Sequence, residues 1–399
     1  MNETLKIIQN SLKEINEQCY IISSYENNIP LVITLLGKKM LTRKLFIFIY
    51  KDKRPVIISH VIDKYFLNEN KDEYDVLTYK TYQEMLLLEK ECLKDIDTVL
   101  MDISEEGLLP RISLADYGTV KYITSLDVEV KSSGDILQIV SSTISKTGFK
   151  LMQQASTLNL KIKDEAFNKI KEDILSNGYS DEYEVQQFIT KRYKEENMYF
   201  DEAPIVAVNK NASNPHYGPT SNVSSKIYKD DVVLIDMWAK MNDSEAIYSD
   251  ITWMGQVSNT ISNVVNERFL ILRKAVDKAI YFLNENLKKR KVYGYEVDDI
   301  VRGEISKTKY KDYFTHRTGH SIYKDDSPHG PGCNIDDYES KDTRSILKNT
   351  AFSLEPGIYY TDFGMRLETD VYIDENYNVI LIGSRQDKMI EILKWAYIL

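Results

Sequence analysis

The chain has 399 residues, of which 43% are hydrophobic, and its 51 basic and 61 acidic residues give a net charge of −10. This length is enough for two domains, or for one large domain with a smaller one. The acidic excess argues against nucleic acid or an anionic membrane as the main partner.

The cysteines and the N-terminus bear on the cellular compartment. Cys19, Cys92 and Cys333 lie far apart and form no CxxC pair, so we predict neither a disulfide framework nor a zinc ribbon. A reducing environment fits this pattern, and we expect a cytoplasmic location. The first residues carry charges throughout, and no apolar run reaches about 18 residues. We therefore expect neither secretion nor a membrane-spanning helix.

Residues 1–132 alternate between short apolar runs and helical patterns. The candidate strands are CYIIS, LVITLL, KLFIFIY, PVIIS and TVLMDI, and a helix is expected over residues 81–96. This alternation predicts an α/β domain with a sheet covered by helices. The polar segment KSSGD at 131–135 is typical of a linker, so we place a domain boundary after residue 132.

The second part of the chain begins with strongly helical patterns. We expect helices over residues 136–158, 163–175 and 263–289, and a further one that begins at Asp181. Asn177-Gly178 is a signal for the end of a helix. Asp181 and Glu184 have the spacing of a capping box. The apolar stripes of these helices are typical of a protein core.

Residues 351–372, AFSLEPGIYYTDFGMRLETDVY, contain two glutamates at an informative spacing. A hairpin that turns at Thr361-Asp362 would place Glu355 directly opposite Glu368, with Cβ atoms roughly 5 Å apart. Two carboxylates at this distance repel each other unless a cation lies between them or one of them is protonated. The hairpin therefore indicates a metal site.

A second pair of carboxylates lies on the candidate strands DVVLIDMW and IYSDITWMG. A register centred on Asp243 would place Asp236 opposite Asp250. A lone aspartate is more often an N-cap or a surface residue. However, Asp236 is flanked by VVLI and MW, and an unpaired carboxylate is costly in apolar surroundings. The pair therefore repeats the pattern of the two glutamates.

The histidines supply the nitrogen ligand, and four of the five lie after residue 210: His216, His316, His320 and His329. His320 stands in HRTGHSIY, where Gly319 permits close backbone approach. One imidazole with four carboxylates is an oxygen-rich set suited to a pair of divalent ions such as manganese, with cobalt, iron or zinc as alternatives. A structural zinc site would instead be dominated by cysteine and histidine.

Together these residues resemble the metallopeptidase family of Xaa-Pro aminopeptidase, prolidase and methionine aminopeptidase, which shares the pita-bread fold with creatinase. The resemblance rests on the segments FDEAPIVAVNKNASNPHYGPT, VVLIDMWAKMNDSEAIYSDITWMG, HRTGHSIYKDDSPHGPG, AFSLEPGIYY and GMRLETDVYI. The preceding part is similar to the creatinase-type N-terminal domain of the Xaa-Pro enzymes, which methionine aminopeptidases lack. The resemblance thus implies an α+β chain, with an α/β creatinase-type domain over residues 1–132 and a pita-bread catalytic domain over residues 133–399.

The resemblance also implies an activity and a role for each site residue. The expected metal ligands are Asp236, Asp250, His320, Glu355 and Glu368. Glu355 would also transfer a proton, and His216 and His329 would donate hydrogen bonds to the substrate. Arg366 stands two residues before Glu368, which places it on the same strand face, and we expect it to orient the ligand carboxylates. We expect a homodimeric metallo-aminopeptidase that removes the residue before a proline from a peptide with a free N-terminus. The alternatives are a prolidase-type Xaa-Pro dipeptidase, a creatinase-like C–N hydrolase and a non-catalytic peptide-binding protein.

Three departures from the family pattern are visible. The two aspartates are further apart than in the common pattern, which predicts an enlarged hairpin loop over residues 240–246. Trp253 stands where many members have arginine, and His329 is displaced along the sequence within SPHGPG. We expect the last two departures to bear on substrate selectivity.

Overall fold

The computed structural model describes residues 2–26 and 29–394. The chain divides into two compact units, Met1–Ser141 and Ser142–Leu399. The boundary follows residue 141, whereas the sequence suggested residue 132, because Ile136, Leu137 and Val140 pack into a core of the first unit. Among the helices of the described residues, none is both long enough and apolar enough to span a bilayer.

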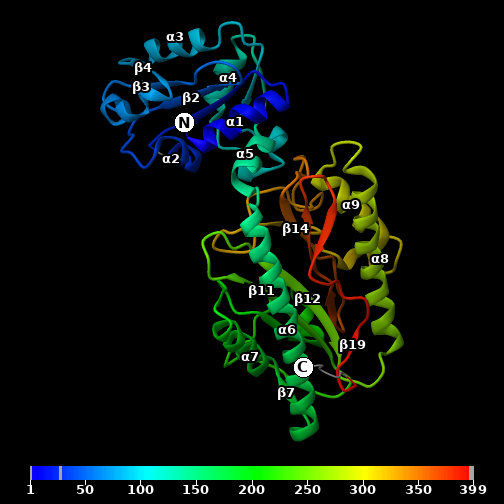
Figure 1. The fold of residues 1–399 in the computed structure, drawn as a ribbon. Helices are drawn as coiled ribbons and strands as arrows, with labels where there is room; N and C mark the ends of the chain where they lie inside the picture. The colour runs from blue at the N-terminus through cyan, green and yellow to red at the C-terminus, as the bar shows by residue number, and fades with distance from the viewer. Residues whose placement is uncertain (1, 27–28, 395–399) are drawn as a thin grey trace. The chain divides into compact units, whose positions relative to one another are not determined.

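The first unit is a six-stranded sheet with helices on both faces (Figure 1). Its strands are β1 (Cys19–Ser24), β2 (Leu45–Tyr50), β3 (Val56–His60), β4 (Asp75–Tyr79), β5 (Thr98–Met101) and β6 (Glu129–Ser132). Its α-helices are α1 (Glu3–Glu14), α2 (Pro30–Leu36), α3 (Tyr82–Cys92), α4 (Tyr117–Thr124) and α5 (Gly134–Ser142). The strand order is β4-β3-β2-β1-β5-β6, with β1 antiparallel to β2 and parallel to β5.

The central strands of this sheet are buried on both faces because successive side chains point in opposite directions. In β1, Tyr20 and Ile22 pack against α1 and α2, whereas Cys19 and Ile21 pack into the second core, on the side of α3 and α4. The near-continuous apolar runs of the sequence therefore mark doubly covered strands.

One predicted strand of this unit is wrong. LVITLL lies in helix α2, which begins with Pro30 at its first position and buries Leu31, Val32, Leu35 and Leu36. A short apolar run does not distinguish a buried strand from a buried helix, and the proline was the available signal for a helix start.

The described residues of the second unit form long helices, a five-stranded sheet, a four-stranded sheet and two two-stranded sheets, and all of the strand pairs but one are antiparallel. Its α-helices are α6 (Lys146–Asn177), α7 (Glu182–Glu195), α8 (Asn263–Asn286) and α9 (Gly294–Ile305). Its strands are β7 (Ser180–Asp181), β8 (Met198–Tyr199), β9 (Ile205–Val208), β10 (Lys226–Ile227), β11 (Val232–Met241), β12 (Ser249–Gln256), β13 (Ser321–Ile322), β14 (Thr350–Leu354), β15 (Gly357–Tyr359), β16 (Gly364–Arg366), β17 (Thr369–Ile373), β18 (Val379–Ile382) and β19 (Ile390–Glu391).

The helices of this unit differ in part from the sequence prediction. α6 is one continuous helix of 32 residues where two were expected, and α5 is separate from it. The ends agree better: Gly178 ends α6 in the left-handed conformation at φ 82°, and the side chain of Asp181 caps α7 by accepting from the backbone N–H groups of Tyr183 and Glu184. The predicted apolar stripe of α8 is buried.

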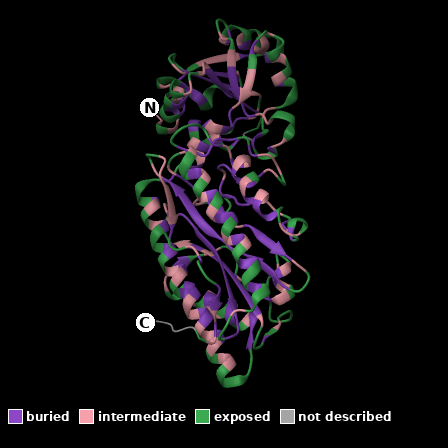
Figure 2. Cartoon of the chain, turned by 90° about the vertical axis from the view of Figure 1, so that its right-hand side faces the viewer, coloured by how far each residue is buried: buried purple, intermediate pink, exposed green. Residues whose placement is uncertain are grey.

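The sheets of the second unit lie inside layers of helices. α6 packs along β11 and β12 (Figure 1), whereas α8 and α9 share a core with β14, β15, β16 and β17. β11 pairs with β12, β8 and β9, while β14 and β17 pair with each other and with β13 and β18. The long strands β11 and β12 are buried along most of their length (Figure 2).

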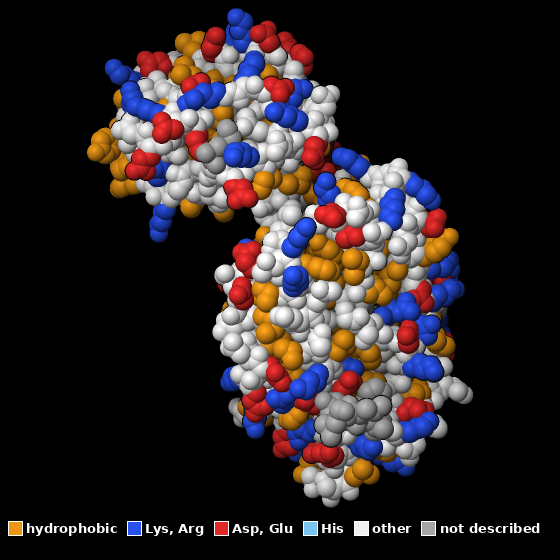
Figure 3. Space-filling view, in the orientation of Figure 1, with side chains coloured by type: hydrophobic (Ala, Val, Ile, Leu, Met, Phe, Trp, Pro, Cys, Tyr) orange, Lys and Arg blue, Asp and Glu red, His pale blue; other side chains and the backbone are white. Residues whose placement is uncertain are grey.

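The surface shows no segregation of charge on the face that is drawn in Figure 3, where basic and acidic side chains are interspersed over both units. The net negative charge is therefore not gathered into one patch on this face.

Candidate metal centre

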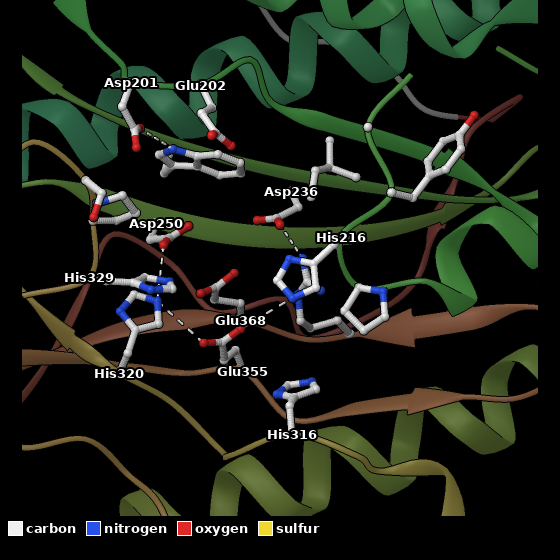
Figure 4. Close-up of a pocket in the computed structure, with 18 of the residues that line it drawn as sticks. Asp201, Glu202, His216, Asp236, Asp250, His316, His320, His329, Glu355 and Glu368 are labelled. Atoms are coloured by element: carbon white, nitrogen blue, oxygen red, sulfur yellow. Dashed lines mark hydrogen bonds and ion pairs between the residues drawn. The ribbon is translucent and has the colours of Figure 1, made fainter. Parts of the chain in front are cut away.

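A cavity of about 530 Å³ in the second unit contains every side chain that the sequence singled out as a site residue (Figure 4). It is lined by the predicted residues His216, Asp236, Asp250, His320, His329, Glu355, Arg366 and Glu368. These residues come from segments that are far apart in the chain, and the two hairpins bring them together.

The glutamate hairpin has the predicted register. Leu354 pairs with Thr369 and Gly357 pairs with Arg366, so Glu355 stands opposite Glu368 in the gap between these two ladders. Glu355 and Glu368 lie outside both strand pairs, and their backbone N–H groups donate to other segments of the chain. The backbone N–H of Glu355 donates to the carbonyl of Thr318 at 2.8 Å, and that of Glu368 donates to the carbonyl of Thr252 at 3.3 Å. Both carboxylates line the cavity.

The predicted register of the aspartate hairpin is wrong. Asp236 pairs with Thr252, and Asp250 pairs with Trp238. The two aspartates are therefore diagonal neighbours and not directly opposed. Because the offset is an even number of residues, both side chains still point to the same face of the sheet. The loop that joins the strands covers residues 242–248, close to the predicted enlargement.

His320 closes the group of carboxylates. Its Nε2 lies 3.5 Å from Asp250 Oδ2 and 3.4 Å from Glu355 Oε1. Its Nδ1 lies 3.1 Å from the carbonyl oxygen of Ser321, so a proton on Nδ1 satisfies that carbonyl and leaves the Nε2 lone pair directed at the carboxylates. This is the tautomer that a metal-binding histidine needs.

The donor set fits a divalent cation. Single donor atoms of Asp250, His320 and Glu368 all lie within 4.8 Å of one another, and all three residues are buried. Asp250 Oδ1 is buried and has no hydrogen-bond partner in the described part of the chain. Buried acceptor oxygens that converge in this way are costly without a cation. The chemistry of the donors, four carboxylates and one imidazole, matches hard or borderline divalent ions.

The electrostatics of the metal-free group point in the same direction. Burial raises the pKa of Asp250 to about 7, and burial together with the neighbouring carboxylates raises the pKa of Glu368 well above its usual value. Burial also acts to raise the pKa of Glu355, but the charges of His320, His316 and Arg366 outweigh it, and the net shift is downward. Glu355 is thus the member of the group that most readily stays ionised.

Arg366 holds one aspartate in place. Its guanidinium donates to Asp236 and pairs with it, and its Nε donates to the hydroxyl of Thr252 at 3.1 Å. The same hydroxyl donates to Glu368 Oε2 at 2.7 Å. Arg366 therefore orients Asp236 directly and Glu368 through Thr252.

Sequence reasoning assigned no role to two of these supporting residues. Thr252 occupies the position opposite Asp236 that had been given to Asp250. The hydroxyl of Tyr359 accepts from Arg366 at 3.3 Å and lies 2.7 Å from His316 Nε2. Its position after Glu355 in EPGIYY was the only available signal, and it does not reveal the partners.

Two histidines flank the carboxylates from opposite sides. Figure 4 shows His216 on one side of them, with His320 and His329 on the other. The ring of His329 lies 4.0 Å from that of His320. His216 is exposed, and its imidazole makes no hydrogen bond or ion pair to another described residue. Both histidines line the cavity.

The two tryptophans of the aspartate hairpin lie on opposite faces of the sheet. Trp253 points away from the cavity into the core beneath α6, where Lys163 Nζ lies 3.6 Å from the centre of its ring. This placement gives no support to the expectation that Trp253 bears on substrate selectivity. Trp238 lines the cavity instead, and its Nε1 donates to Asp201 Oδ1 at 2.7 Å.

Residues 150–375 match the model of metallopeptidase family M24. The match covers more than half of the chain, which therefore belongs to this family. The expected relationship to the Xaa-Pro aminopeptidase and prolidase group is confirmed at the level of this family.

Two curated relatives match the chain over part of its length. It is 32% identical over 182 residues to a putative Xaa-Pro aminopeptidase of Mycoplasma pneumoniae, covering 45% of this chain and 46% of that protein. It is 34% identical over 168 residues to an Xaa-Pro dipeptidase of Lactobacillus helveticus, covering 41% of this chain and 40% of that protein. The matched segment thus spans less than half the length of each relative.

Solved structures match almost the whole chain. The X-Pro aminopeptidase from Thermotoga maritima MSB8 has a TM-score of 0.55 at 20% identity and covers 96% of this chain and 99% of that one. The prolidase from Pyrococcus horikoshii OT3 has a TM-score of 0.54 at 20% identity and covers 98% of this chain and 100% of that one. At these identities the likeness shows the fold, which is the α+β pita-bread fold that the sequence predicted.

Proposed function

We propose that this chain is a metal-dependent aminopeptidase that hydrolyses the bond between an N-terminal residue and a following proline. The observation that carries the proposal is the convergence of four carboxylates and an imidazole in one cavity. His216 lies on one side of this group and His329 on the other. A peptide with a free N-terminus is the proposed substrate. A prolidase-type dipeptidase is the second candidate.

We propose that Asp236, Asp250, His320, Glu355 and Glu368 hold two divalent ions. Manganese is the first candidate, with cobalt, zinc or iron as alternatives. When bound, the ions would lower the pKa of a water molecule at the site and stabilise negative charge that develops on the peptide carbonyl oxygen.

Glu355 is the proposed proton acceptor. Its carboxylate lines the cavity beside His320, where it can accept a proton from the attacking water and later pass it to the leaving amine. The hydroxyl of Ser353 lies 3.1 Å from Glu355 Oε1 and the His320 ring lies beside it, which restricts its orientation.

His216 and His329 are the proposed hydrogen-bond donors to the substrate carbonyl and to the tetrahedral intermediate. Each lines the cavity at the edge of the carboxylate group. Donors that are in place before the reaction stabilise developing charge most effectively, since they need not reorganise. Arg366 is proposed to act indirectly, because it holds the carboxylate of Asp236 in position.

The charges of the cavity wall favour an aminopeptidase over a dipeptidase. Outside the carboxylate group the wall carries three acidic residues, Asp201, Glu202 and Glu339. The two arginines that line the cavity are already paired, Arg317 with Glu339 at 3.5 Å and Arg366 with Asp236. A dipeptide would bring its C-terminal carboxylate into this acidic surrounding, whereas a longer peptide places that charge further away.

The test is a peptide-length series assayed with manganese, cobalt and zinc. Xaa-Pro dipeptides and Xaa-Pro peptides of three or more residues are compared, with peptides that lack proline at the second position as the control. Faster cleavage of the longer peptides supports the aminopeptidase, and cleavage of dipeptides alone supports the dipeptidase. Cleavage of neither after metal reconstitution would overturn both proposals in favour of a non-catalytic peptide-binding protein.

We also propose a homodimer, which sedimentation equilibrium of the purified full chain tests directly. A monomer over the whole concentration range would contradict it.

A further inference from the structure

Glu182 is a fully buried carboxylate at the first position of α7, outside the carboxylate group of the cavity. It forms no ion pair with any cation in the described part of the chain. Because an unpaired buried charge is costly, its hydrogen bonds and the positive end of the helix must compensate for the lost hydration. The identity of its donors is therefore informative.

All of those donors belong to one segment of the chain, residues 208–225. The backbone N–H of Val208 donates to the Glu182 carboxylate at 2.6 Å and that of Ser225 donates to it at 2.8 Å, so Glu182 binds the backbone at both ends of the segment. Between them, Asn211 Nδ2 donates at 2.9 Å and the hydroxyl of Tyr217 donates at 2.6 Å. Charge-assisted hydrogen bonds of this kind are stronger than neutral ones.

This segment carries His216 to the cavity. Pro215, Tyr217 and Gly218 line the cavity beside it. The backbone N–H of His216 donates to Asn214 Oδ1 at 3.1 Å, and the imidazole has no hydrogen-bond partner among the described residues. The position of the imidazole ring therefore depends on the backbone of the segment. The residue next to it, Tyr217, donates a hydrogen bond from its hydroxyl to Glu182.

We propose that Glu182 is a positioning residue that holds segment 208–225 so that His216 faces the metal centre. This inference rests on the proposed function, in which His216 donates to the substrate. Glu182 acts through His216 and touches neither metal nor substrate. Its loss should therefore lower turnover while leaving the binding of metal unchanged.

The first test is a double-mutant cycle in the full-length, metal-loaded protein, with Glu182→Gln, His216→Ala and the double variant assayed on an Xaa-Pro tripeptide. Glu182→Gln should lower kcat/KM by about 10- to 100-fold, since small misplacements of catalytic groups have effects of this size. The kcat/KM of the double variant should lie within about 3-fold of that of His216→Ala, because the effects of two coupled residues do not add. Losses that multiply in the double variant would overturn the proposal.

Two variants control for an effect on folding. Glu184→Gln removes an exposed carboxylate from the same helix and should retain the activity of the wild-type protein. If Glu182→Gln does not fold, Tyr217→Phe removes a single donor and should show a smaller loss that is likewise absent in the His216→Ala background. Full activity of Tyr217→Phe, or a loss that persists without His216, would contradict the proposal. Metal content by elemental analysis should be the same in all variants.

The second test needs no activity. Hydrogen–deuterium exchange should become faster in segment 208–225 of Glu182→Gln, or of Tyr217→Phe, and should stay unchanged there in Glu184→Gln. Equal exchange in all variants would overturn the proposal. If the wild-type protein cleaves no Xaa-Pro peptide, the proposed function fails, while the exchange measurement still decides whether Glu182 holds this segment.

Discussion

The two hairpins that carry the carboxylates obey the same pairing rules but differ in what sets their register. In the glutamate hairpin the turn sets it: Arg268, which is only 2% exposed, makes two hydrogen bonds of 2.7 Å to Asp362 and a third to the carbonyl of Phe363. In the aspartate hairpin the loop over residues 242–248 is longer. Neighbouring strands flank both hairpins, since β9 and β19 pair with β11 and β12 as β13 and β18 pair with β14 and β17. In the aspartate hairpin, where the loop is longer, we infer that these neighbours set the register.

This difference explains why one register was predictable and the other was not. A tight turn is a local feature, so its centre can be read from the residues that form it. A longer loop permits several centres, and distant strands select among them. The offset moved Thr252 into the place opposite Asp236, where it links Arg366 to Glu368.

The largest expected effect comes from the glutamate hairpin. Glu355→Gln should retain the fold but lower kcat by about 10²- to 10⁴-fold, because it removes the proposed proton acceptor. Steady-state kinetics on an Xaa-Pro tripeptide, with thermal unfolding as a check on the fold, measure this. Glu375→Gln, an exposed change in the same unit, is the matched control. Turnover within a few-fold of wild type in Glu355→Gln would contradict the proton-transfer role.

The next effect tests the link that the aspartate hairpin makes through Thr252. Thr252→Val keeps the volume but removes the hydroxyl that binds Glu368 and Arg366, so metal affinity should fall about 10- to 100-fold. Isothermal titration with manganese measures the affinity. Thr190→Val is the control, because its hydroxyl is buried without a hydrogen-bond partner among the described residues. Equal affinity in both variants would show that the hydroxyl does not support the site.

The third effect tests the turn of the glutamate hairpin. Asp362→Ala leaves the buried Arg268 without its carboxylate partner and should lower the free energy of unfolding by about 1–2 kcal/mol, a figure reduced because the Asp362 side chain is half-exposed. Urea unfolding measures it, with Asp312→Ala on the short 3₁₀ helix η5 (Lys311–Tyr313) as the control. An unchanged midpoint would mean that the turn does not depend on this pair.

The same pair predicts a direction of pH dependence. Burial acts to raise the pKa of Asp362, but hydrogen bonds from Arg268 outweigh it and hold the pKa below its usual value. A carboxyl with a lowered folded-state pKa stabilises the fold above its unfolded pKa of 3.8 and loses that contribution as the pH falls below it. The difference in stability between wild type and Asp362→Ala should therefore shrink in acid. A difference that stays constant below that pH would contradict the assignment.

The smallest expected effect distinguishes the hairpins most directly. One glycine inserted between Asn242 and Asp243 should change the free energy of unfolding by less than about 1 kcal/mol, since lengthening a loop is cheap when other strands hold the register. The same insertion between Thr361 and Asp362 disturbs the turn that sets the register and should be clearly more costly and weaken metal binding. Chemical unfolding and manganese titration compare the two. An equal loss of unfolding free energy for the two insertions would show that the registers of the two hairpins are set in the same way.

Several features were predictable because their signals are local. Asn177-Gly178 ends α6, and Asp181 caps α7, because capping depends on neighbouring residues. LVITLL forms a helix and not the predicted strand, because a short apolar run fits either element and only Pro30, at the first position of α2, signals the helix. α6 is one continuous helix where the sequence predicted two, and it packs along β11 and β12 over much of its length.

The sequence by itself determined the chemical types of the proposed ligands, the register of the glutamate hairpin and the family to which the chain belongs, because motifs and tight turns are written in adjacent residues. Only the tertiary structure decided the diagonal arrangement of Asp236 and Asp250 and the orientation of Trp253 away from the cavity. The same holds for the hydrogen bonds between Glu182 and the segment that carries His216. Each of these depends on contacts between residues far apart in the chain, which local sequence patterns do not record.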